Sequence, residues 1–391
     1  MNGISLKRLD WTMLGTILLL IGLSAAFIFS AQFKSEEVYG SNWIKQLGFA
    51  GMGLFAYAAL VWYDYLHIAK LSWFVYGGAV FLLLLVFAFP ALNGAHRWIP
   101  LPGFTLQPSE LAKIAVIIAL AAYLGAPDRD MDEWKTFFGC AAIAGLPFLL
   151  IAAEPDLSTS LTLVPISLAI MLYCGVQRRL LLIGVAAVVV LAAGVCFWIK
   201  YETTPETEAL PKAERPALVL PHMPFMEEYQ KGRIKVFLTR DHDMAGAGWN
   251  KLQSQIAVGS GGLYGKGYLN GTQNILGFLP RTVAPTDFIF CVIAEETGFA
   301  GGAGFVLLYS VLLGRCMRAS IRAREEFGRL MALGIGVMVF CHVFVNIAMT
   351  IGILPITGLP LPLMSYGGSF MVSTMIALGL VQSVYHRRRI R

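Results

Sequence analysis

Long apolar runs alternate with short polar segments along the whole chain. Each run is about 20 residues long, which is the length an α-helix needs to cross the hydrocarbon core of a bilayer. The apolar runs that we predict to be membrane spans lie near 11–31, 44–64, 71–90, 108–125, 136–153, 159–175, 179–199, 286–314, 329–354 and 363–385. The pattern therefore predicts an all-α integral membrane protein, in which residues 1–391 form a single polytopic domain with ten transmembrane helices.

Positive charges in the short connecting segments predict the orientation of these helices. With ten spans, both termini lie on the same side of the membrane. If that side is the cytoplasm, the short inner segments hold 16 lysines and arginines, and the short outer segments hold only Lys34, Lys45 and Arg97. Because cytoplasmic loops carry the excess of positive charge, both termini are predicted to be cytoplasmic. Residues 200–285 then form one long extracytoplasmic loop between helices seven and eight.

Composition supports a membrane protein and argues against other classes. Hydrophobic residues make up 57% of the chain and charged residues 14%, against roughly 25% charged residues in soluble domains. The net charge of +6 is not gathered on one soluble face, so no nucleic-acid partner is expected. The six cysteines are scattered in apolar runs without metal-ligand spacing, which argues against disulfides and metal sites. The first apolar run, from Trp11, has no cleavage site and is interpreted as a span.

The long loop divides into three parts of different composition. Residues 201–224 are rich in proline and contain few large apolar side chains, so this part is not expected to fold on its own. Residues 225–240 mix apolar and charged side chains, which is typical of an interfacial helix. Residues 246–277 are rich in glycine and precede the eighth span. The sequence shows no internal repeat with matched broken helices, which many transporters have.

Ionisable residues are costly inside a membrane, and most of those near the spans fall at the predicted outer ends of helices. Glu110 is in the first turn of the fourth span, and Lys113 lies on the same face about one turn deeper. Arg97 is in the outer loop before that span. Asp156 is in the short outer turn between spans five and six, and Asp287 begins span eight. These five residues are the first candidates for a functional site.

Each candidate has a structural interpretation beside the functional one. Glu110 and Lys113 could simply neutralise each other, and Arg97 could extend its charge to the membrane interface. Asp156 and Asp287 could only cap the helices that they precede. What favours function is convergence, because acids and bases from separate helix ends would line one outward-opening cleft.

The glycine-rich stretch 259–267 looks like a phosphate-binding loop, but it departs from the P-loop pattern in two places. Ser260 stands where the pattern has its first glycine, and Gly267 stands where the pattern has Ser or Thr after the lysine, here Lys266. Its backbone amides, together with Lys266, could hold the pyrophosphate of a lipid carrier. The alternative is a flexible re-entrant linker. Residues 241–243, Asp-His-Asp, have the side chains of a metal site, but three adjacent side chains point apart and no dedicated site is expected. Glu295 and Glu296 lie deeper in span eight, where a charge needs a partner or water.

Six motifs, in their order and spacing, resemble the SEDS (shape, elongation, division, sporulation) family. The match runs from the third span to the tail. The motifs are Gly94-Ala95-His96-Arg97-Trp98-Ile99, Gln107-Pro108-Ser109-Glu110-Leu111-Ala112-Lys113, Glu154-Pro155-Asp156-Leu157, Gln253-Ser254-Gln255-Ile256-Ala257-Val258-Gly259-Ser260-Gly261-Gly262, Thr286-Asp287-Phe288-Ile289-Phe290 and Leu361-Pro362-Leu363-Met364-Ser365-Tyr366-Gly367-Gly368. The stretch from Gly265 to Gln273 looks more like the elongation members of the family than the division members.

The resemblance implies a ten-helix glycosyltransferase in the cytoplasmic (inner) membrane. Such an enzyme polymerises lipid II into glycan strands at the outer face of the membrane, during cell elongation and maintenance of rod shape. The resemblance also implies that Asp287 is the catalytic acidic residue and that Glu110 and Lys113 lie in the cavity. A class B penicillin-binding protein, which is a transpeptidase, is the expected partner, together with other membrane proteins of the elongation complex.

The long loop departs from the family pattern in three places. Arg281 stands where the family usually has a glutamate, and Pro285 stands where it usually has a histidine. The proline-rich part, 201–224, is also longer than usual. These departures concern the geometry of the loop and its contacts with substrate.

The expected mechanism is an inverting glycosyl transfer. Asp287 takes the proton of an acceptor hydroxyl, the oxygen attacks the anomeric carbon of a second lipid-linked sugar, and undecaprenyl pyrophosphate leaves. Positive charge for the leaving group is expected from Arg97, Lys113, Lys266 or a loosely held divalent cation, Mg²⁺ or Mn²⁺, and no tightly bound cofactor is expected. The predicted substrate-binding residues are Arg97, Glu110, Lys113, Asp156 and Lys266.

Two other classes of protein have the same composition. A flippase or transporter for the lipid-linked precursor would place polar groups near the bilayer midplane and open to both faces. A scaffold for wall-synthesis enzymes would not need Asp287 at all. Polymer formation from lipid II by the purified protein distinguishes the three.

Overall fold

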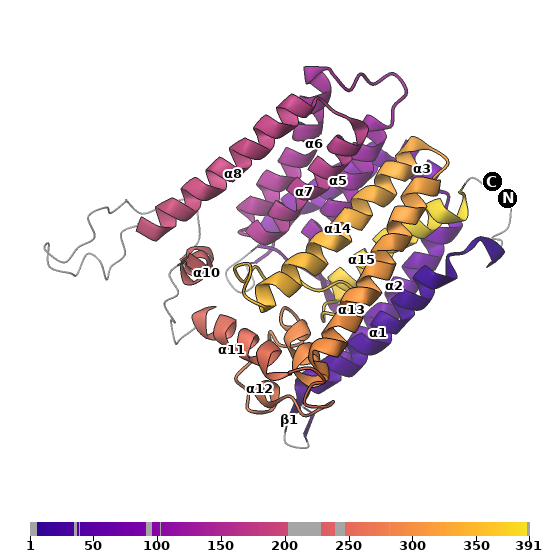
Figure 1. Ribbon diagram of the computed structural model, residues 1–391. Coiled ribbons are helices and arrows are strands. Elements are labelled where there is room, and N and C mark those ends of the chain that lie inside the picture. The colour runs from indigo at the N-terminus through magenta and orange to yellow at the C-terminus, as the bar shows by residue number, and fades with distance from the viewer. Residues whose placement is uncertain are drawn as a thin grey trace, which may run out of the picture.

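The structure is a computed structural model, and it shows a bundle of long helices (Figure 1). It describes residues 6–34, 37–38, 40–90, 96–101, 103–201, 228–238, 247–280 and 282–388. The long helices are α1 (Trp11–Gln32), α2 (Asn42–Trp62), α4 (Ser72–Leu85), α5 (Pro108–Leu124), α6 (Trp134–Ala153), α7 (Leu157–Cys174), α8 (Arg178–Tyr201), α13 (Ile289–Arg322), α14 (Glu326–Thr350) and α15 (Gly368–His386). The shorter helices are η1 (Leu6–Arg8), α3 (Tyr65–Lys70), η2 (Val86–Ala88), α10 (Glu228–Leu238), α11 (Ala247–Ser260) and α12 (Thr272–Ile275).

In the part of the chain that the structure describes, strands occur only in two short antiparallel hairpins. The first pairs β1 (Phe33–Lys34) with β2 (Glu37–Val38) directly after α1. The second pairs β3 (Ile99–Leu101) with β4 (Phe104–Leu106) and leads into α5. The fold is therefore all-helical apart from these connections.

Each apolar run of the sequence coincides with one of the long helices. Within the residues that the structure describes, eight helices are long and apolar enough to cross a membrane by length and composition. The helix Ser72–Ala88, which joins α4 and η2, is shorter, and α5 has 17 residues. The chain is thus a multi-pass membrane protein, whereas a count of ten crossings stays a prediction.

Burial differs sharply between the centre and the edge of the bundle. In the most apolar 18-residue segment of each helix, 72% of the residues of α14 and 83% of those of α15 are buried, but only 6% of those of α8. Helices in lipid come together through close packing of small residues. At Gly379, α15 approaches α2 so closely that a Cβ atom would meet the Tyr57 backbone at 3.0 Å. By contrast, α8 runs along the edge of the bundle (Figure 1).

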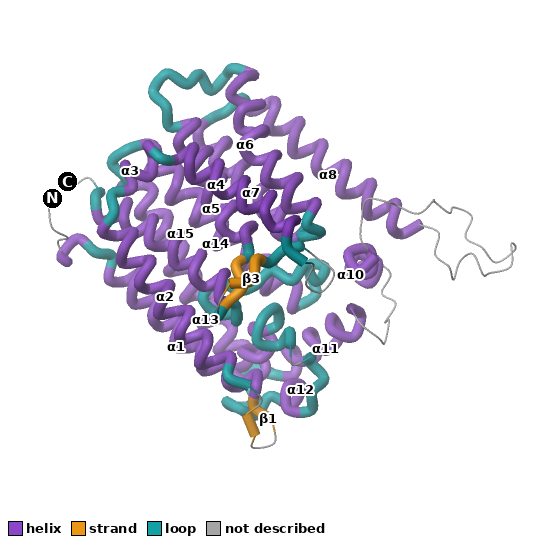
Figure 2. Tube along the Cα trace, turned by 180° about the vertical axis from the view of Figure 1, so that it is seen from behind, coloured by secondary structure: helices purple, strands orange, loops and turns teal. Residues whose placement is uncertain are grey.

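The two ends of the bundle carry different elements. Both chain ends and α3 lie at one end, and α10, α11, α12 and β1 lie at the other, which we name the α10 end (Figure 1). The view from behind shows the β3–β4 hairpin on the side of the bundle toward α10 (Figure 2). The described helices of the long connection between α8 and α13 are therefore at the end opposite to α3.

The long connection contains more helix than its composition indicates. α10 lies within the stretch 225–240, where an interfacial helix is predicted. α11 begins the glycine-rich stretch 246–277, because one face of it, with Gln253 and Ala257, is buried and packs on α13. Almost all of the proline-rich part 201–224 and all of 241–243 lie outside the described residues.

α13 is broken near its beginning. Gly298 has φ 67° and ψ −165°, a conformation that favours glycine because it has no Cβ atom. The glycine-rich stretch packs into this break: Phe299 N–H donates to Gly262 O at 2.8 Å, and Ala300 N–H donates to Leu263 O at 3.0 Å. Backbone groups that a broken helix leaves open are thus satisfied by the long connection.

Candidate active site

A cavity of about 920 Å³ lies at the α10 end. Its walls come from α2, the β3–β4 hairpin, the start of α5, the turn between α6 and α7, α10, the residues before α13, the connection 351–367 and the start of α15. The predicted site residues that line it are Arg97, Glu110, Asp156 and Asp287. Lys113 is buried beside Glu110 behind this wall, and Lys266 is elsewhere.

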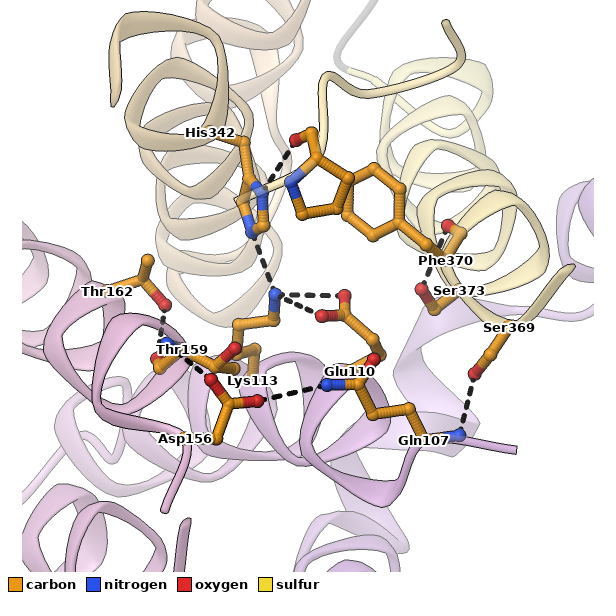
Figure 3. A network of polar contacts seen from close by, with 11 residues as sticks. Gln107, Glu110, Lys113, Asp156, Thr159, Thr162, His342, Ser369, Phe370 and Ser373 are labelled. Carbon is orange, nitrogen blue, oxygen red and sulfur yellow. Dashed lines mark hydrogen bonds and ion pairs between the residues drawn. The ribbon is translucent and has the colours of Figure 1, made fainter. Parts of the chain in front are cut away.

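Glu110 and Lys113 form a buried ion pair in the first turns of α5 (Figure 3). The helix begins at Pro108, which suits a first helical position because its missing N–H needs no partner. The Nζ atom of Lys113 lies 2.9 Å from each carboxylate oxygen of Glu110. The two side chains therefore neutralise each other, and Glu110 also faces the cavity.

His342, from α14, continues this pair toward the connection 351–367 (Figure 3). Its Nε2 atom lies 2.7 Å from Lys113 Nζ, and its Nδ1 atom lies 3.2 Å from Pro360 O. An ammonium group only donates, and a carbonyl oxygen only accepts. His342 is therefore neutral, with its proton on Nδ1. Sequence reasoning overlooked His342, although an ionisable residue inside an apolar span is itself the signal.

Asp156 caps a helix and also lines the cavity, so the capping interpretation is confirmed and a contact with substrate stays a prediction. Its Oδ1 atom accepts from Thr159 N–H at 3.3 Å and so caps α7. Its Oδ2 atom accepts from Gln107 Nε2 at 3.0 Å, and Asp156 lines the cavity (Figure 3). Gln107 N–H in turn donates to Ser369 Oγ at 3.0 Å, which ties α5 to α15.

Arg97 joins the β3–β4 side of the cavity to the turn between α6 and α7. Its Nε atom donates to Glu154 O at 3.2 Å, and its Nη2 atom donates to Pro155 O. The carboxylate oxygens of Glu154 are buried, and neither has a hydrogen-bond partner in the described part of the chain. Burial and the nearby Asp156 raise the pKa of Glu154 to about 8, while Arg97 opposes the rise.

The backbone around Asp287 is held from two directions. Asn346 Nδ2, on α14, donates to Asp287 O at 3.0 Å and to Leu359 O at 2.8 Å. On the other side, Ser365 Oγ donates to Thr286 O at 2.5 Å. These bonds fix Asp287 two residues before α13, at the wall of the cavity.

The side chain of Asp287 is half-buried and has a shifted acidity. Burial raises the pKa of Asp287 to about 6, and the Arg233 charge and the Thr286 hydroxyl oppose the rise. A carboxyl with a pKa near neutrality can both hold and release a proton at physiological pH. Asp287 is therefore suited to act as a general base.

Two cations of the cavity were not among the predicted site residues. Arg233, on α10, and Lys45, on α2, both line it. Arg233 Nη1 donates to Thr357 O at 3.1 Å. Nothing in the sequence places Arg233 near Asp287, because the two residues are separated by most of the long connection.

Lys266 is engaged away from the cavity. Its Nζ atom lies 2.5 Å from Glu295 Oε1 and 2.8 Å from Ser260 Oγ, and it also contacts Thr272 Oγ1. Glu295 further accepts from Gln273 N–H at 3.0 Å. These contacts fasten the glycine-rich stretch onto α13, so the partner that Glu295 requires is Lys266.

No ready-made metal centre is found in the described ranges. No group of three His, Cys, Asp or Glu side chains there converges closely enough to hold an ion, and all six cysteines are free thiols.

The arrangement as a whole suits transfer chemistry on an anionic substrate. The cavity volume is in the range of small-molecule sites, roughly 300–1,000 Å³. A guanidinium group such as that of Arg97 matches phosphate geometry. A base with a pKa near neutrality faces the same space.

Known proteins resemble this chain over almost its full length. A family model described as a cell cycle protein, named for FtsW, RodA and SpoVE, matches residues 10–390. The chain is 36% identical over 394 residues to the peptidoglycan glycosyltransferase MrdB of Escherichia coli (strain K12), covering 98% of this chain and 95% of MrdB. It is 31% identical over 426 residues to the peptidoglycan glycosyltransferase RodA of Treponema pallidum (strain Nichols), covering 97% and 98%.

Solved structures share the fold. A chain of a peptidoglycan synthase complex, described for its coordination of polymerization and crosslinking, superposes with a TM-score of 0.75 at 25% identity, covering 96% of this chain and 97% of that one. Rod shape determining protein RodA of Thermus thermophilus superposes with a TM-score of 0.67 at 25% identity, covering 98% of each. The family resemblance of the sequence motifs is thereby confirmed. The chain belongs to the cell cycle protein family of FtsW, RodA and SpoVE, and it is a multi-pass membrane peptidoglycan glycosyltransferase.

Proposed function

We propose that this glycosyltransferase polymerises lipid II into glycan strands at the outer face of the cytoplasmic membrane, during elongation of rod-shaped cells. Ten helices would cross the membrane, with both termini cytoplasmic and the α10 end outside. The excess of positive charge in the short segments at the other end supports this orientation. The similarity to MrdB and RodA over almost the whole chain supports the role in elongation.

One observation carries the proposal: a single cavity brings together three acidic and three basic side chains from segments far apart in the sequence. Asp287 precedes α13, Arg97 precedes the β3–β4 hairpin, Glu110 begins α5, and Lys45 is on α2. A structural pair would need no common space. A transferase needs a base and positive charge around the same reacting group.

Asp287 acts as the general base in the proposed reaction. Its carboxylate accepts the proton of the acceptor's hydroxyl group, and that oxygen forms a bond to the anomeric carbon of the second sugar. The bond between this carbon and the pyrophosphate oxygen breaks, and its electron pair leaves with undecaprenyl pyrophosphate. The anomeric carbon is inverted. Since a pyrophosphate leaves readily, one base suffices, unlike the carboxylate pair of a glycosidase.

Charge that develops on the pyrophosphate is stabilised by the cations of the cavity wall. Arg97 is suited to this role because carbonyl oxygens of the α6–α7 turn hold its guanidinium in place. Lys113 does not line the cavity and acts indirectly, because its ion pair holds Glu110 in place at the cavity wall. A phosphate contact by Lys266 stays a prediction and requires the ammonium to leave Glu295.

A loosely held Mg²⁺ or Mn²⁺ also stays a prediction. Mg²⁺ usually binds through one or two carboxylates together with substrate phosphates. Such an ion would arrive with the lipid pyrophosphate, which fits the lack of a three-ligand cluster in the described residues. Dependence of the rate on added Mg²⁺ after EDTA treatment tests it.

The proposed partner is a class B penicillin-binding protein, acting within the elongation complex. The similarity to a chain of a peptidoglycan synthase complex supports a partner that crosslinks what this chain polymerises. Co-purification of the two membrane proteins, followed by a polymerisation assay of each alone and of both, tests whether the partner is needed.

The decisive test is polymerisation of labelled lipid II by purified wild-type protein and by Asp287→Asn, each with and without the transpeptidase. Asn keeps the size of the side chain but cannot accept the proton. We expect glycan strands from the wild type and none from the variant, at equal thermal stability. A fully active Asp287→Asn variant would remove this residue from the chemistry. Lipid II movement across vesicles without polymer would favour a flippase instead.

A reporter fused within the long connection tests the orientation. A periplasmically active reporter, such as β-lactamase, placed between α8 and α10 should protect cells, and the same reporter at the C-terminus should not. The opposite result would place the cavity on the wrong side for its substrate.

A further inference from the structure

Arg233 lines the cavity although it belongs to the long connection between α8 and α13. It is on α10, and its Nη1 atom donates to Thr357 O at 3.1 Å. Thr357 and the following Gly358 also line the cavity, as Asp287 does. The connection 351–367 therefore lies between the arginine and the aspartate.

The position of Gly358 gives an upper limit for the distance between the Asp287 carboxylate and the Arg233 guanidinium. A Cβ atom on Gly358 would lie 3.3 Å from Asp287 Oδ2 and 3.4 Å from Arg233 Nη1. One atom position is thus in contact distance of both groups, so the two atoms are at most about 7 Å apart. At this separation in a partly buried site, an opposite charge acts strongly on a carboxyl.

Other ionisable groups also face the cavity. They are Lys45 on α2, Arg97 before the β3–β4 hairpin, Glu110 on α5, Asp156 before α7 and Tyr366 before α15. Among all of these and Arg233, the Arg233 guanidinium is the charge that lowers the pKa of Asp287 against the effect of burial. The Thr286 hydroxyl acts in the same direction.

We infer that Arg233 is a positioning residue of the transferase site: its guanidinium stabilises the ionised carboxylate of Asp287, the form that accepts the proton of the acceptor hydroxyl. This inference rests on the proposed role of Asp287 as the base. Burial makes the cavity suitable for transfer chemistry but favours a protonated carboxyl, which is inactive as a base. The charge from α10 offsets that effect without forming a bond to the substrate.

The sign of the effect on the rate follows directly. A base is active when it is ionised, so the rate rises as the pH passes upward through the pKa of Asp287. Removing the Arg233 charge raises that pKa further, so the acidic limb of the pH–rate profile moves to higher pH. The rate is lost most at low pH and recovers as the pH rises.

The experiment compares Arg233→Gln with Arg233→Lys in the complete protein, with lipid II polymerisation followed from pH 5 to pH 9. For Arg233→Gln we expect the acidic limb of kcat to move up by about one pH unit or more. Arg233→Lys keeps the charge and should leave the limb where the wild type has it, even if the rate falls. KM for lipid II should change little in either variant.

Two outcomes would overturn the inference. A rate that falls by the same factor at every pH would mean that Arg233 only holds the 351–367 connection through Thr357. A rise in KM with an unmoved acidic limb would mean that Arg233 binds substrate and does not act on Asp287. If the wild-type protein makes no glycan at all, the proposed function fails. A loss of activity that is confined to the variants leaves the proposed function intact.

A second measurement does not depend on activity. Infrared difference spectra between each protein and its Asp287→Asn counterpart isolate the absorption of the protonated Asp287 carboxyl. Titration of this band should give a higher midpoint in Arg233→Gln than in the wild type and an unchanged midpoint in Arg233→Lys. Equal midpoints in all three proteins would refute the inference, whatever the rates.

Discussion

Two lysine–glutamate pairs at the same end of the bundle have different surroundings. Glu110 and Lys113 are both buried, Glu110 lines the cavity, and Lys113 continues to His342. The other pair joins fully buried Glu295 to Lys266, whose side chain is 26% exposed. It lies outside the cavity lining and fastens the glycine-rich stretch onto the broken helix α13.

The difference shows that the cost of a buried charge does not tell what the charge is for. Both pairs satisfy the same physical requirement, because an ionised group in an apolar region needs a partner. Only the further contacts distinguish the two pairs: one pair contacts the cavity wall that contains Asp287, and the other contacts only the long connection. We therefore expect the first pair to control activity and the second to control stability.

Neutral replacement of each pair tests this expectation most severely and should give the largest effect. Glu110→Gln/Lys113→Met and Glu295→Gln/Lys266→Met both remove two charges without leaving one of them buried alone. We expect the first double variant to lose polymerisation by at least about 100-fold while remaining folded. The second should retain activity within about 3-fold. Initial rates with lipid II and melting temperatures are measured for both variants. Equal activity of the two variants would contradict the expectation that only the first pair controls activity.

The link from Lys113 to the cavity wall predicts a smaller loss. In His342→Leu the lysine keeps Glu110 but loses its second acceptor, and Pro360 O loses its donor, which costs about 1–3 kcal/mol for unsatisfied buried groups. We expect the polymerisation rate to fall by about 10-fold. His67→Leu is the control, because His67 is exposed at the other end of the bundle. A wild-type rate in His342→Leu would show that the first pair acts without the 351–367 connection.

A methyl group can be placed between the two charges of the site. Gly358→Ala puts a Cβ atom in contact with both Asp287 and Arg233, at a φ of 79°. Gly175→Ala adds the same strain, at a φ of 76°, but has open space around it. We expect both variants to lose about 1 kcal/mol of stability, and only Gly358→Ala to lose activity, by several-fold. Equal rates would mean that the gap at Gly358 tolerates a methyl group.

How far the sequence could predict the site follows from the range of each interaction. Glu110 and Lys113 are three residues apart on one helix, so their pairing follows from helical geometry. Asp156 could be recognised as a cap for the same reason. Arg233 and His342 could not be assigned, because their partners, Asp287 and Lys113, come from distant segments.

The fold shows the same limit. Apolar runs predict where the long helices lie, because membrane thickness imposes their length. The glycine-rich composition of 246–277 gave no expectation of a helix, but α11 forms there because its buried face packs on α13. The break at Gly298 was also not expected, since the apolar run continues through it.

Glu154 extends the comparison to a buried glutamate without a lysine, and its effect should be the smallest. Its pKa of about 8 lies above that of an unfolded glutamate, about 4.3. Between these values the unfolded state is ionised and the folded state is not, so stability falls as the pH rises through this window. Glu154→Gln removes that loss.

We expect Glu154→Gln to melt a few degrees above the wild type at pH 7.5 and at nearly the same temperature at pH 4.5. Thermal denaturation in one detergent at the two pH values measures this. A variant less stable than the wild type at pH 7.5 would indicate that the ionised carboxylate is in fact paired with Arg97.

Asn346 has a consequence for inhibitor design. By holding Asp287 O and Leu359 O at once, it makes the wall formed by Asp287 and the connection 351–367 a preorganised surface. A competitive ligand that takes its contacts from this surface would lose little affinity to induced fit. Antibacterial leads against this transferase should therefore be anchored on the wall that Asp287 and the connection 351–367 form.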